Sequence, residues 1–318
     1  MKKKTSHILR IALPLLLGVA LVWYSLSKIS IKELLGYFKN ANYAYICLGL
    51  FFGLLSHLSR AYRWKYMIEP MGYTLRLGNS IMAVFTAYLV NYTIPRAGEI
   101  SRATVLTNYE GVPFEKGFGT IVAERIADMI VMMGIILITL FLEFDYIYNF
   151  FIERFDPFKI AMGVVGLVVL GGLFLWFIRQ SQSTFASKLR SFATGLIEGA
   201  SAIFKMKHKW AFIGHTLFIW SMYILMFYVT TFALTETSNI PFAAILIAFI
   251  SASFSIAATN GGIGSFPEAI VIVFVTIFGL PEDPSRAFGW IMWSSQTFMI
   301  IVLGGLSLFY LPIYNKIK

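Results

Sequence analysis

The chain has 318 residues, of which 58% are hydrophobic and 13% charged, and its mean hydropathy of +0.74 excludes an ordinary soluble domain. A net charge of +10 could indicate a nucleic-acid partner, but the lysines and arginines gather in short segments between apolar runs, where they orient membrane proteins and attract anionic lipids. The single cysteine, Cys47, excludes an internal disulfide and a cysteine-based metal site. We therefore expect membrane lipids as partners, no nucleic acid, no metal and no cofactor.

Nine apolar runs follow one another along the chain, and several reach the 17–25 residues that a helical membrane span requires. They predict an all-α, polytopic membrane helix bundle. The first run follows three lysines, as in a signal peptide, but no small-residue cleavage site follows it, so we interpret it as a retained span. The runs are 11–27, 43–58, 80–94, 118–142, 160–178, 210–234, 242–258, 269–280 and 287–311.

The distribution of charge predicts which loops face the cytoplasm. The two chain ends and the loops 60–78 and 179–209 are rich in lysine and arginine, so both termini are expected inside. Loop 142–159 is acid-rich and loop 235–241 has no basic residue, so both are expected outside. Loop 28–42 must be external if the first two apolar runs both span the membrane, yet it carries three lysines, so it is the one exception to the charge rule. Basic residues around Trp64 are interpreted as a cytoplasmic interface belt: Arg60, Arg63 and Lys65.

With the loops assigned to these sides of the membrane, some apolar runs cannot cross it. Run 80–94 begins and ends on the cytoplasmic side, so we expect a re-entrant hairpin with its tip at 91–99. Runs 242–258 and 269–280 lie between two external segments and predict a hairpin that enters from outside, with its tip at 260–268. The second arm of that hairpin, with about twelve residues, covers only roughly 18 Å.

The predicted fold therefore has about six full spans and two opposed re-entrant hairpins. We expect one integral membrane domain, 1–318, in which the halves 8–142 and 160–311 form an inverted repeat. In transporters, such repeats place broken helices and the substrate site near the membrane midplane.

The first tip places charged residues directly after an apolar run, where each charge costs roughly 2.5–3.5 kcal/mol at the membrane centre. Pro95 fits the first turn of a new helix, and Glu99 and Arg102 lie three residues apart on one face of it. Arg96 and Arg102 suit a phosphate, because a guanidinium binds it through two hydrogen bonds. Asn91 is a further candidate for the headgroup. The alternative is a basic segment at the membrane surface with snorkelling arginines.

The run 118–142 contains three ionisable residues, Glu124, Arg125 and Asp128. Their spacing of three and four residues predicts that they pair and face the bundle interior. One hypothesis is an internal salt bridge; the other is a proton or cation relay through Glu124 or Asp128.

The second tip is rich in glycine, which permits positive φ and close backbone approach. Ser265 and Glu268 form a capping-box pattern around Pro267, so a helix is expected to start near Phe266, with its N-terminal amides available to an anion. The alternative is an ordinary loop between helices. The candidate binding residues here are Asn260, Gly261, Gly262, Gly264, Ser265 and Glu268.

Three ordered motifs together resemble the lysylphosphatidylglycerol synthase transmembrane family, which includes the flippase half of the multiple peptide resistance factor. They are Asn-x3-Pro-Arg-x-Gly-Glu-x2-Arg at 91–102, Glu-Arg-x2-Asp at 124–128 and Gly-Gly-Ile-Gly-x3-Glu at 261–268. The resemblance implies a lipid-binding or lipid-translocating bundle in a bacterial or archaeal plasma membrane. Bifunctional members add a soluble domain that transfers an aminoacyl group from tRNA, but this chain ends at Lys318. We therefore expect no aminoacyl transfer.

The leading hypothesis is a lipid transporter that binds an anionic or zwitterionic headgroup in a midplane cavity. One alternative is an intramembrane enzyme acting on a lipid phosphate, with Glu99 as its base, although no convincing catalytic constellation is present. Another is a scaffold that transports nothing, with an envelope enzyme or a second copy of the chain as its partner.

Overall fold

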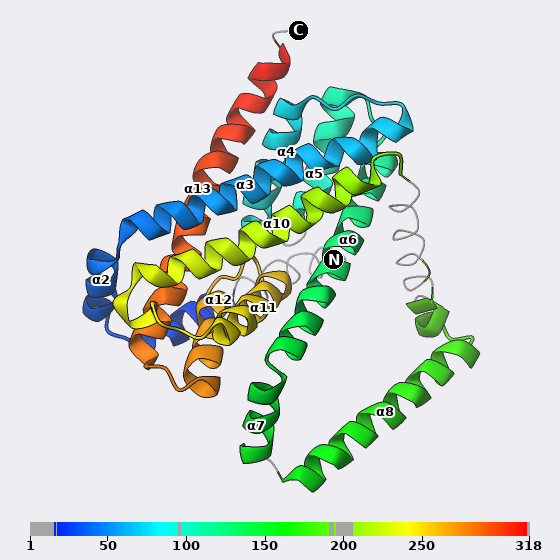
Figure 1. Cartoon of the computed structure of the whole chain (residues 1–318). Helices are drawn as coiled ribbons and strands as arrows, with labels where there is room; N and C mark the ends of the chain where they lie inside the picture. Colours follow the sequence, from blue (N-terminus) through cyan, green and yellow to red (C-terminus); the bar gives the residue numbers. More distant parts are fainter. Residues whose placement is uncertain are drawn as a thin grey trace, which may run out of the picture. The chain divides into compact units, whose positions relative to one another are not determined.

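The structure, a computed structural model, describes residues 16, 18–94, 97–154, 156–187, 189–190, 194 and 206–316 (Figure 1). It confirms the predicted all-α membrane bundle, since the described residues form helices and no strands. Four helices are long and apolar enough to cross a membrane: Tyr43–Met71, Phe114–Leu142, Lys209–Ala233 and Glu282–Lys316. Shorter apolar helices are Gly18–Ser27, Val168–Gln180, Phe242–Ala258 and Ser265–Ile277.

The chain divides into two compact units. The first comprises Met1–Val122 and Trp210–Lys318, and the second Ala123–Lys209. The second contains most of α6 (Phe114–Leu142), then α7 (Phe144–Arg154) and α8 (Pro157–Gln180). The arrangement of 1–318 as one domain with two inverted halves is not tested by this division and stays a prediction.

The first unit contains both predicted hairpins. Its helices are α2 (Ile31–Asn40), α3 (Tyr43–Ile68), α4 (Leu77–Thr93), α5 (Ala97–Glu110), the start of α6, α10 (Lys209–Thr230), α11 (Phe242–Ala258), α12 (Ser265–Val271) and α13 (Glu282–Lys316). A π-helical segment, Ile272–Ile277, extends α12, and short 3₁₀ helices cover Glu69–Met71, Thr231–Ala233 and Thr235–Thr237.

The helix α2 occupies the segment predicted as loop 28–42. Ser30 starts it with a complete capping box, in which its hydroxyl accepts from the amide of Glu33 and the Glu33 carboxylate accepts from the Ser30 backbone. Hydrogen bonds from the Ser30 hydroxyl and then its amide hold the pKa of Glu33 below its ordinary value. A helix, rather than an extended loop, therefore connects the first apolar helix to α3.

The contacts of α3 set the direction of its neighbours. It is antiparallel to α10, because Gly49 lies against Thr230 near one end and Arg63 donates to Thr216 near the other. It is also antiparallel to α4, since the Ser80 hydroxyl donates to the carbonyl of Ala61 and the ring of Phe85, further along α4, contacts His57, which is earlier on α3. In Figure 1, α3 and α10 run side by side along the first unit.

The two ends of the first unit are defined by α13. At the Glu282 end, α13 contacts α2 and the 3₁₀ helix Thr235–Thr237, and the amide of Asn42 donates to Ala233 O at 2.8 Å. At the Asn315 end, Asn315 is hydrogen-bonded to Asn79 near the start of α4.

The hairpins enter the first unit from opposite ends. The α4–α5 hairpin starts and finishes at the Asn315 end, where Arg76 pairs with Glu110. The hairpin of α11, α12 and the π-helical segment starts and finishes at the Glu282 end, where Phe242 contacts Tyr228 and residue 277 leads into α13. Both turns therefore lie inside the first unit.

Candidate functional site

The tips of the two hairpins touch. A Cβ atom on Gly261 would lie 2.4 Å from Cε1 of Tyr92, so the Tyr92 ring lies directly on the Gly261 backbone. The Tyr92 hydroxyl is hydrogen-bonded to Thr297, near the middle of α13, at 3.2 Å. The meeting point is therefore about halfway between the two ends of the first unit.

The first tip is held by Asn91 and Gly98. The Asn91 side chain accepts a hydrogen bond from the amide of Gly98 at 2.8 Å, which satisfies one of the free amides at the start of α5. A Cβ on Gly98 would stand 2.2 Å from the carbonyl oxygen of Ala87, so only glycine allows α4 and α5 to cross this closely. Pro95 and Arg96 lie outside the described residues.

The glycines of the second tip adopt the positive φ angles that the sequence predicts. Gly261, Gly262 and Gly264 have φ values of 62°, 76° and 70°, in the left-handed region that favours glycine. The indole of Trp293 donates to the carbonyl of Gly261 at 2.9 Å and fixes the turn against α13. Asn260 precedes the glycines with a side chain only 4% exposed, and among the described residues its Nδ2 atom has no hydrogen-bond partner.

The predicted capping box at Ser265 and Glu268 is wrong. The helix α12 begins at Ser265, one residue before the predicted start, and Gly264 caps it without any side-chain hydrogen bond. The Ser265 hydroxyl is instead bonded to the hydroxyls of Ser255 and Thr259, at 2.7 and 2.8 Å, across the hairpin. The pattern failed because tertiary hydroxyl partners replaced the local backbone partner.

Glu268 forms an ion pair with Arg286 on α13, a residue that the sequence analysis did not select. The Arg286 side chain is 2% exposed and also contacts Glu282, at 2.7 Å, and the hydroxyl of Ser25, at 3.1 Å. The indole of Trp290 donates to the same hydroxyl at 3.0 Å. This cluster joins the second hairpin, α13 and the first apolar helix. The spacing of Glu282 and Arg286, four residues apart on one helix, is the sequence feature that could have identified it.

The predicted interface belt is wrong for Arg60, Arg63 and Trp64. Arg60, Arg63 and Trp64 are buried, and Lys65 is partly exposed. The helix α3 continues to Ile68 and turns these residues toward α5, α6 and α10: Arg63 donates to Thr216 at 2.6 Å, and Trp64 donates to Thr120 at 2.9 Å.

Arg102, a candidate from the first tip, belongs to the same buried region. Its guanidinium lies 3.8 Å from the centre of the Trp64 ring, and the residue is 4% exposed. This cation–π contact places positive charge inside the first unit, where water does not compensate it. Glu99, one turn earlier on α5, is partly exposed.

The charged motif of α6 belongs to the second unit. Glu124 and Asp128 are buried, whereas Arg125 is exposed, so the prediction that all three face the interior is wrong for Arg125. Within the described ranges, no three His, Cys, Asp or Glu side chains gather to hold a metal ion.

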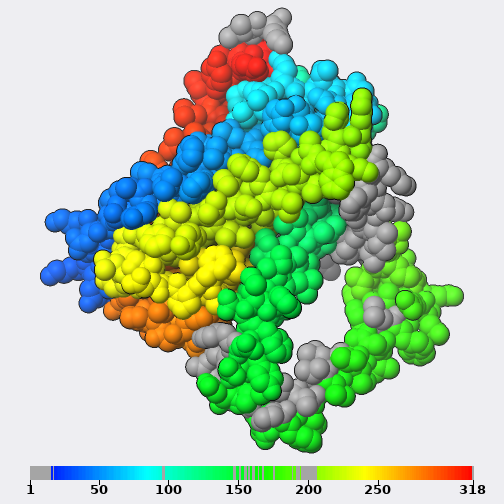
Figure 2. All heavy atoms as spheres, viewed as in Figure 1, coloured from blue at the N-terminus to red at the C-terminus, as the bar shows by residue number. Residues whose placement is uncertain are grey.

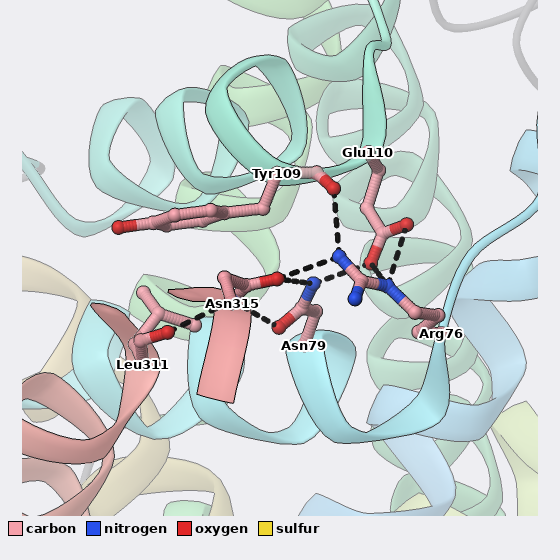
Figure 3. Close-up of polar contacts among 6 residues, drawn as sticks. All are labelled: Arg76, Asn79, Tyr109, Glu110, Leu311 and Asn315. Carbon is pink, nitrogen blue, oxygen red and sulfur yellow. Dashed lines mark hydrogen bonds and ion pairs between the residues drawn. The ribbon is translucent and has the colours of Figure 1, made fainter. Parts of the chain in front are cut away.

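A polar network closes the first hairpin at the Asn315 end (Figure 3). Arg76 binds the Glu110 carboxylate at 3.0 Å, the Tyr109 carbonyl at 2.8 Å and the Asn315 side chain at 2.6 Å. Asn79 donates to Glu110 at 2.5 Å and exchanges hydrogen bonds with Asn315. The network connects both arms of the hairpin to the end of α13, and the sequence analysis did not identify it.

Comparison with known proteins agrees with this architecture. The model of the family described as "Lysylphosphatidylglycerol synthase TM region" matches residues 11–305. The chain belongs to this family. It is a membrane protein of the lysylphosphatidylglycerol synthase transmembrane-region family, as the three motifs indicated.

The chain is similar in sequence to two archaeal proteins. A UPF0104 membrane protein of Methanocaldococcus jannaschii is 22% identical over 289 residues, which cover 81% of this chain and 82% of the relative. Glycosyltransferase AglD of Haloferax volcanii is 25% identical over 105 residues, which cover 33% of this chain and 17% of that protein. No solved structure matches the chain.

Proposed function

We propose that this protein is a flippase-like lipid transporter, which binds an anionic or zwitterionic lipid headgroup between the two hairpin tips. The observation that carries the proposal is the contact of Tyr92 with Gly261, where two hairpins from opposite ends meet. Broken helices inside a membrane bundle are tolerated where they line a cavity or are buried in protein, and in transporters they form the substrate site. Membership of a membrane family named after a lipid synthase supports a lipid as the substrate.

The chemistry of the region supports a phosphate-bearing headgroup. Asn260 offers a buried amide donor beside the glycine turn, and Arg102 supplies buried positive charge in the same unit. Buried polar groups inside membrane proteins are costly, so they commonly mark substrate pathways. The proposed binding residues of the first unit are Asn91, Arg96, Glu99, Arg102, Asn260, Gly261, Gly262, Gly264, Ser265 and Glu268. Glu124, Arg125 and Asp128 belong to the second unit, and a role for them in headgroup binding stays a separate prediction from the sequence.

A translocation assay tests the proposal. The full chain is reconstituted into vesicles that contain a fluorescent phospholipid, with phosphatidylglycerol and phosphatidylcholine headgroups in separate preparations. A membrane-impermeant reductant then quenches the outer leaflet, and the protected fraction reports transport. We expect the protein to expose the protected lipid and Asn260→Ala to slow this about tenfold, the effect of losing one hydrogen bond to a charged group.

Asn108→Ala is the matched control, because Asn108 is an exposed amide on α5. Equal rates for wild type, both variants and empty vesicles would eliminate the transport proposal.

A second candidate is an intramembrane enzyme that acts on a lipid phosphate. The similarity to part of a protein named as a glycosyltransferase favours an enzymatic role, although it covers only 17% of that protein. Release of inorganic phosphate from a polyprenyl or phosphatidyl phosphate, lost in Glu99→Gln, would support this reading. Absence of both transport and phosphate release would favour a scaffold for an envelope enzyme.

The proposed location is a bacterial or archaeal plasma membrane with both termini in the cytoplasm. The basic residues Arg76 and Lys316 lie at the same end of the first unit, since Arg76 contacts Asn315, and this supports the orientation because basic residues favour the cytoplasmic side.

A further inference from the structure

A groove of about 680 Å³ runs along the surface of the first unit, between α3, α4 and α10. Its walls are mostly apolar and include Leu55 on α3, Ile81 on α4 and Phe218 on α10. The α3 part, from Leu55 to Tyr62, extends for about 10 Å along the helix axis. Figure 2 shows α3 and α10 side by side on this face of the molecule. Its volume is typical of a site for one small molecule or one part of a larger one.

Polar side chains are restricted to one part of the groove. Ser59 and His215 face each other across it, with their Oγ and Nδ1 atoms 2.8 Å apart. The His215 ring lies 5.1 Å from the ring of Tyr62, which lines the groove at the Asn315 end. The polar side chains of the groove therefore gather at Ser59, Tyr62 and His215, and the remaining lining residues are apolar on both sides of them.

A cation stands at the polar end of the groove. The Lys65 ammonium donates to the Tyr62 hydroxyl at 2.5 Å and lies 3.8 Å from the centre of the Tyr62 ring. It is also 5.1 Å from the Tyr66 ring, so two aromatic faces hold it in place. Lys65 thus places one positive charge beside Tyr62, at the edge of the groove.

We propose that this groove binds an anionic phospholipid, with one acyl chain along the apolar walls and the phosphate at Lys65, Tyr62 and His215. Charge complementarity selects the occupant: a basic group and two polar donors lie where an anionic headgroup would reach the membrane surface, and an apolar channel leads from them toward the middle of the bundle. The site is separate from the hairpin tips and does not require that the protein transports lipid.

Gly214 on α10 provides a selective way to fill the groove. It lines the groove and is exposed, and a Cβ atom built on it meets no atom within 4 Å. Gly214→Leu therefore adds a side chain to the groove without a clash inside the protein. Gly305→Leu on α13 is the matched control, since Gly305 is also helical and has open space around its Cβ position.

The experiment uses the full chain in lipid nanodiscs that contain photoactivatable lipids. Phosphatidylglycerol and phosphatidylcholine with the same diazirine-bearing acyl chain are compared, and labelled peptides are mapped by mass spectrometry. We expect α3 and α10 groove peptides to be labelled about fivefold more by phosphatidylglycerol, the factor for one basic residue near an anionic lipid. Gly214→Leu should remove this labelling, Gly305→Leu should retain it, and Lys65→Gln should abolish the headgroup preference.

Two results would overturn the inference. Equal labelling by both lipids would show ordinary solvation by the bilayer. Unchanged labelling in Gly214→Leu would place the lipid elsewhere. If the groove is labelled as expected but no lipid is translocated, the transport proposal fails while the groove site stands.

Discussion

The Tyr92 ring lies against the Gly261 backbone so closely that a Cβ on Gly261 would be 2.4 Å from Cε1 of Tyr92. This single relationship joins two hairpins that are more than 160 positions apart in the sequence and enter the first unit from opposite ends. Gly261 also has a φ of 62°, a conformation that favours glycine. Glycine is therefore required at this position both by the backbone conformation and by the lack of room for a Cβ atom beside Tyr92.

Gly261→Ala is therefore expected to destabilise the protein more than the same substitution of another glycine with positive φ. Gly279 is the control, because its φ is 67° but a Cβ there meets nothing within 4 Å. Backbone strain alone costs about 1–2 kcal/mol in both variants, and the collision with Tyr92 adds to it only at Gly261. Thermal unfolding in detergent measures the difference, and equal melting temperatures would contradict the close contact of the tips.

Arg286→Gln is expected to cost about 3–5 kcal/mol, because it leaves the Glu268 carboxylate without its buried cation. Glu282→Gln removes a partner of the same arginine whose side chain is 50% exposed, so it should cost about 1 kcal/mol or less. Chemical denaturation of the two variants provides the comparison. A loss in Glu282→Gln as large as in Arg286→Gln would show that Glu268 is not the dominant partner.

Asn79→Ala should lower stability by about 1–3 kcal/mol, since the buried Glu110 carboxylate loses one hydrogen bond and Asn315 loses two (Figure 3). Asn108→Ala removes an exposed amide from α5 and should be close to neutral. A double-mutant cycle between Asn79 and Asn315 measures their coupling by thermal unfolding. Additive effects of the two single variants would argue against the network.

Single-cysteine labelling tests the membrane sides. In a Cys47→Ser background, cysteines at Ser238 and Asp283 should react with an impermeant reagent from outside, and one at Asn108 from inside. The structure puts Ser238 and Asp283 at the Glu282 end of the first unit and Asn108 near its Asn315 end. Ser238 and Asp283 on opposite sides would contradict the inward hairpin of α11 and α12.

The same experiment probes the tips. Cysteines at Tyr92 and Ser265 should react slowly from either side, because both positions lie within the bundle. Rapid labelling of either position from one side would mean that the tip is exposed at the surface, and the proposed midplane site would lose its basis.

The sequence by itself determined the helical membrane class and the family motifs, and it predicted two hairpins. These depend on local quantities: the length of apolar runs, the charge of loops, and glycines that permit positive φ at 261–264. The parity of the charges was enough to predict that Asn91 to Glu99 forms a turn between short helices, because each span must reverse the side of the chain.

Only the tertiary structure decided which polar groups meet. Ser265 matched a capping box, but the hydroxyls of Ser255 and Thr259 are its partners, and Glu268 pairs with Arg286. Arg63 looked like a surface charge and is buried beside Thr216. Such partners come from helices distant in sequence, and a buried charge or hydroxyl is stabilised only by the groups that packing brings to it, which local spacing does not encode.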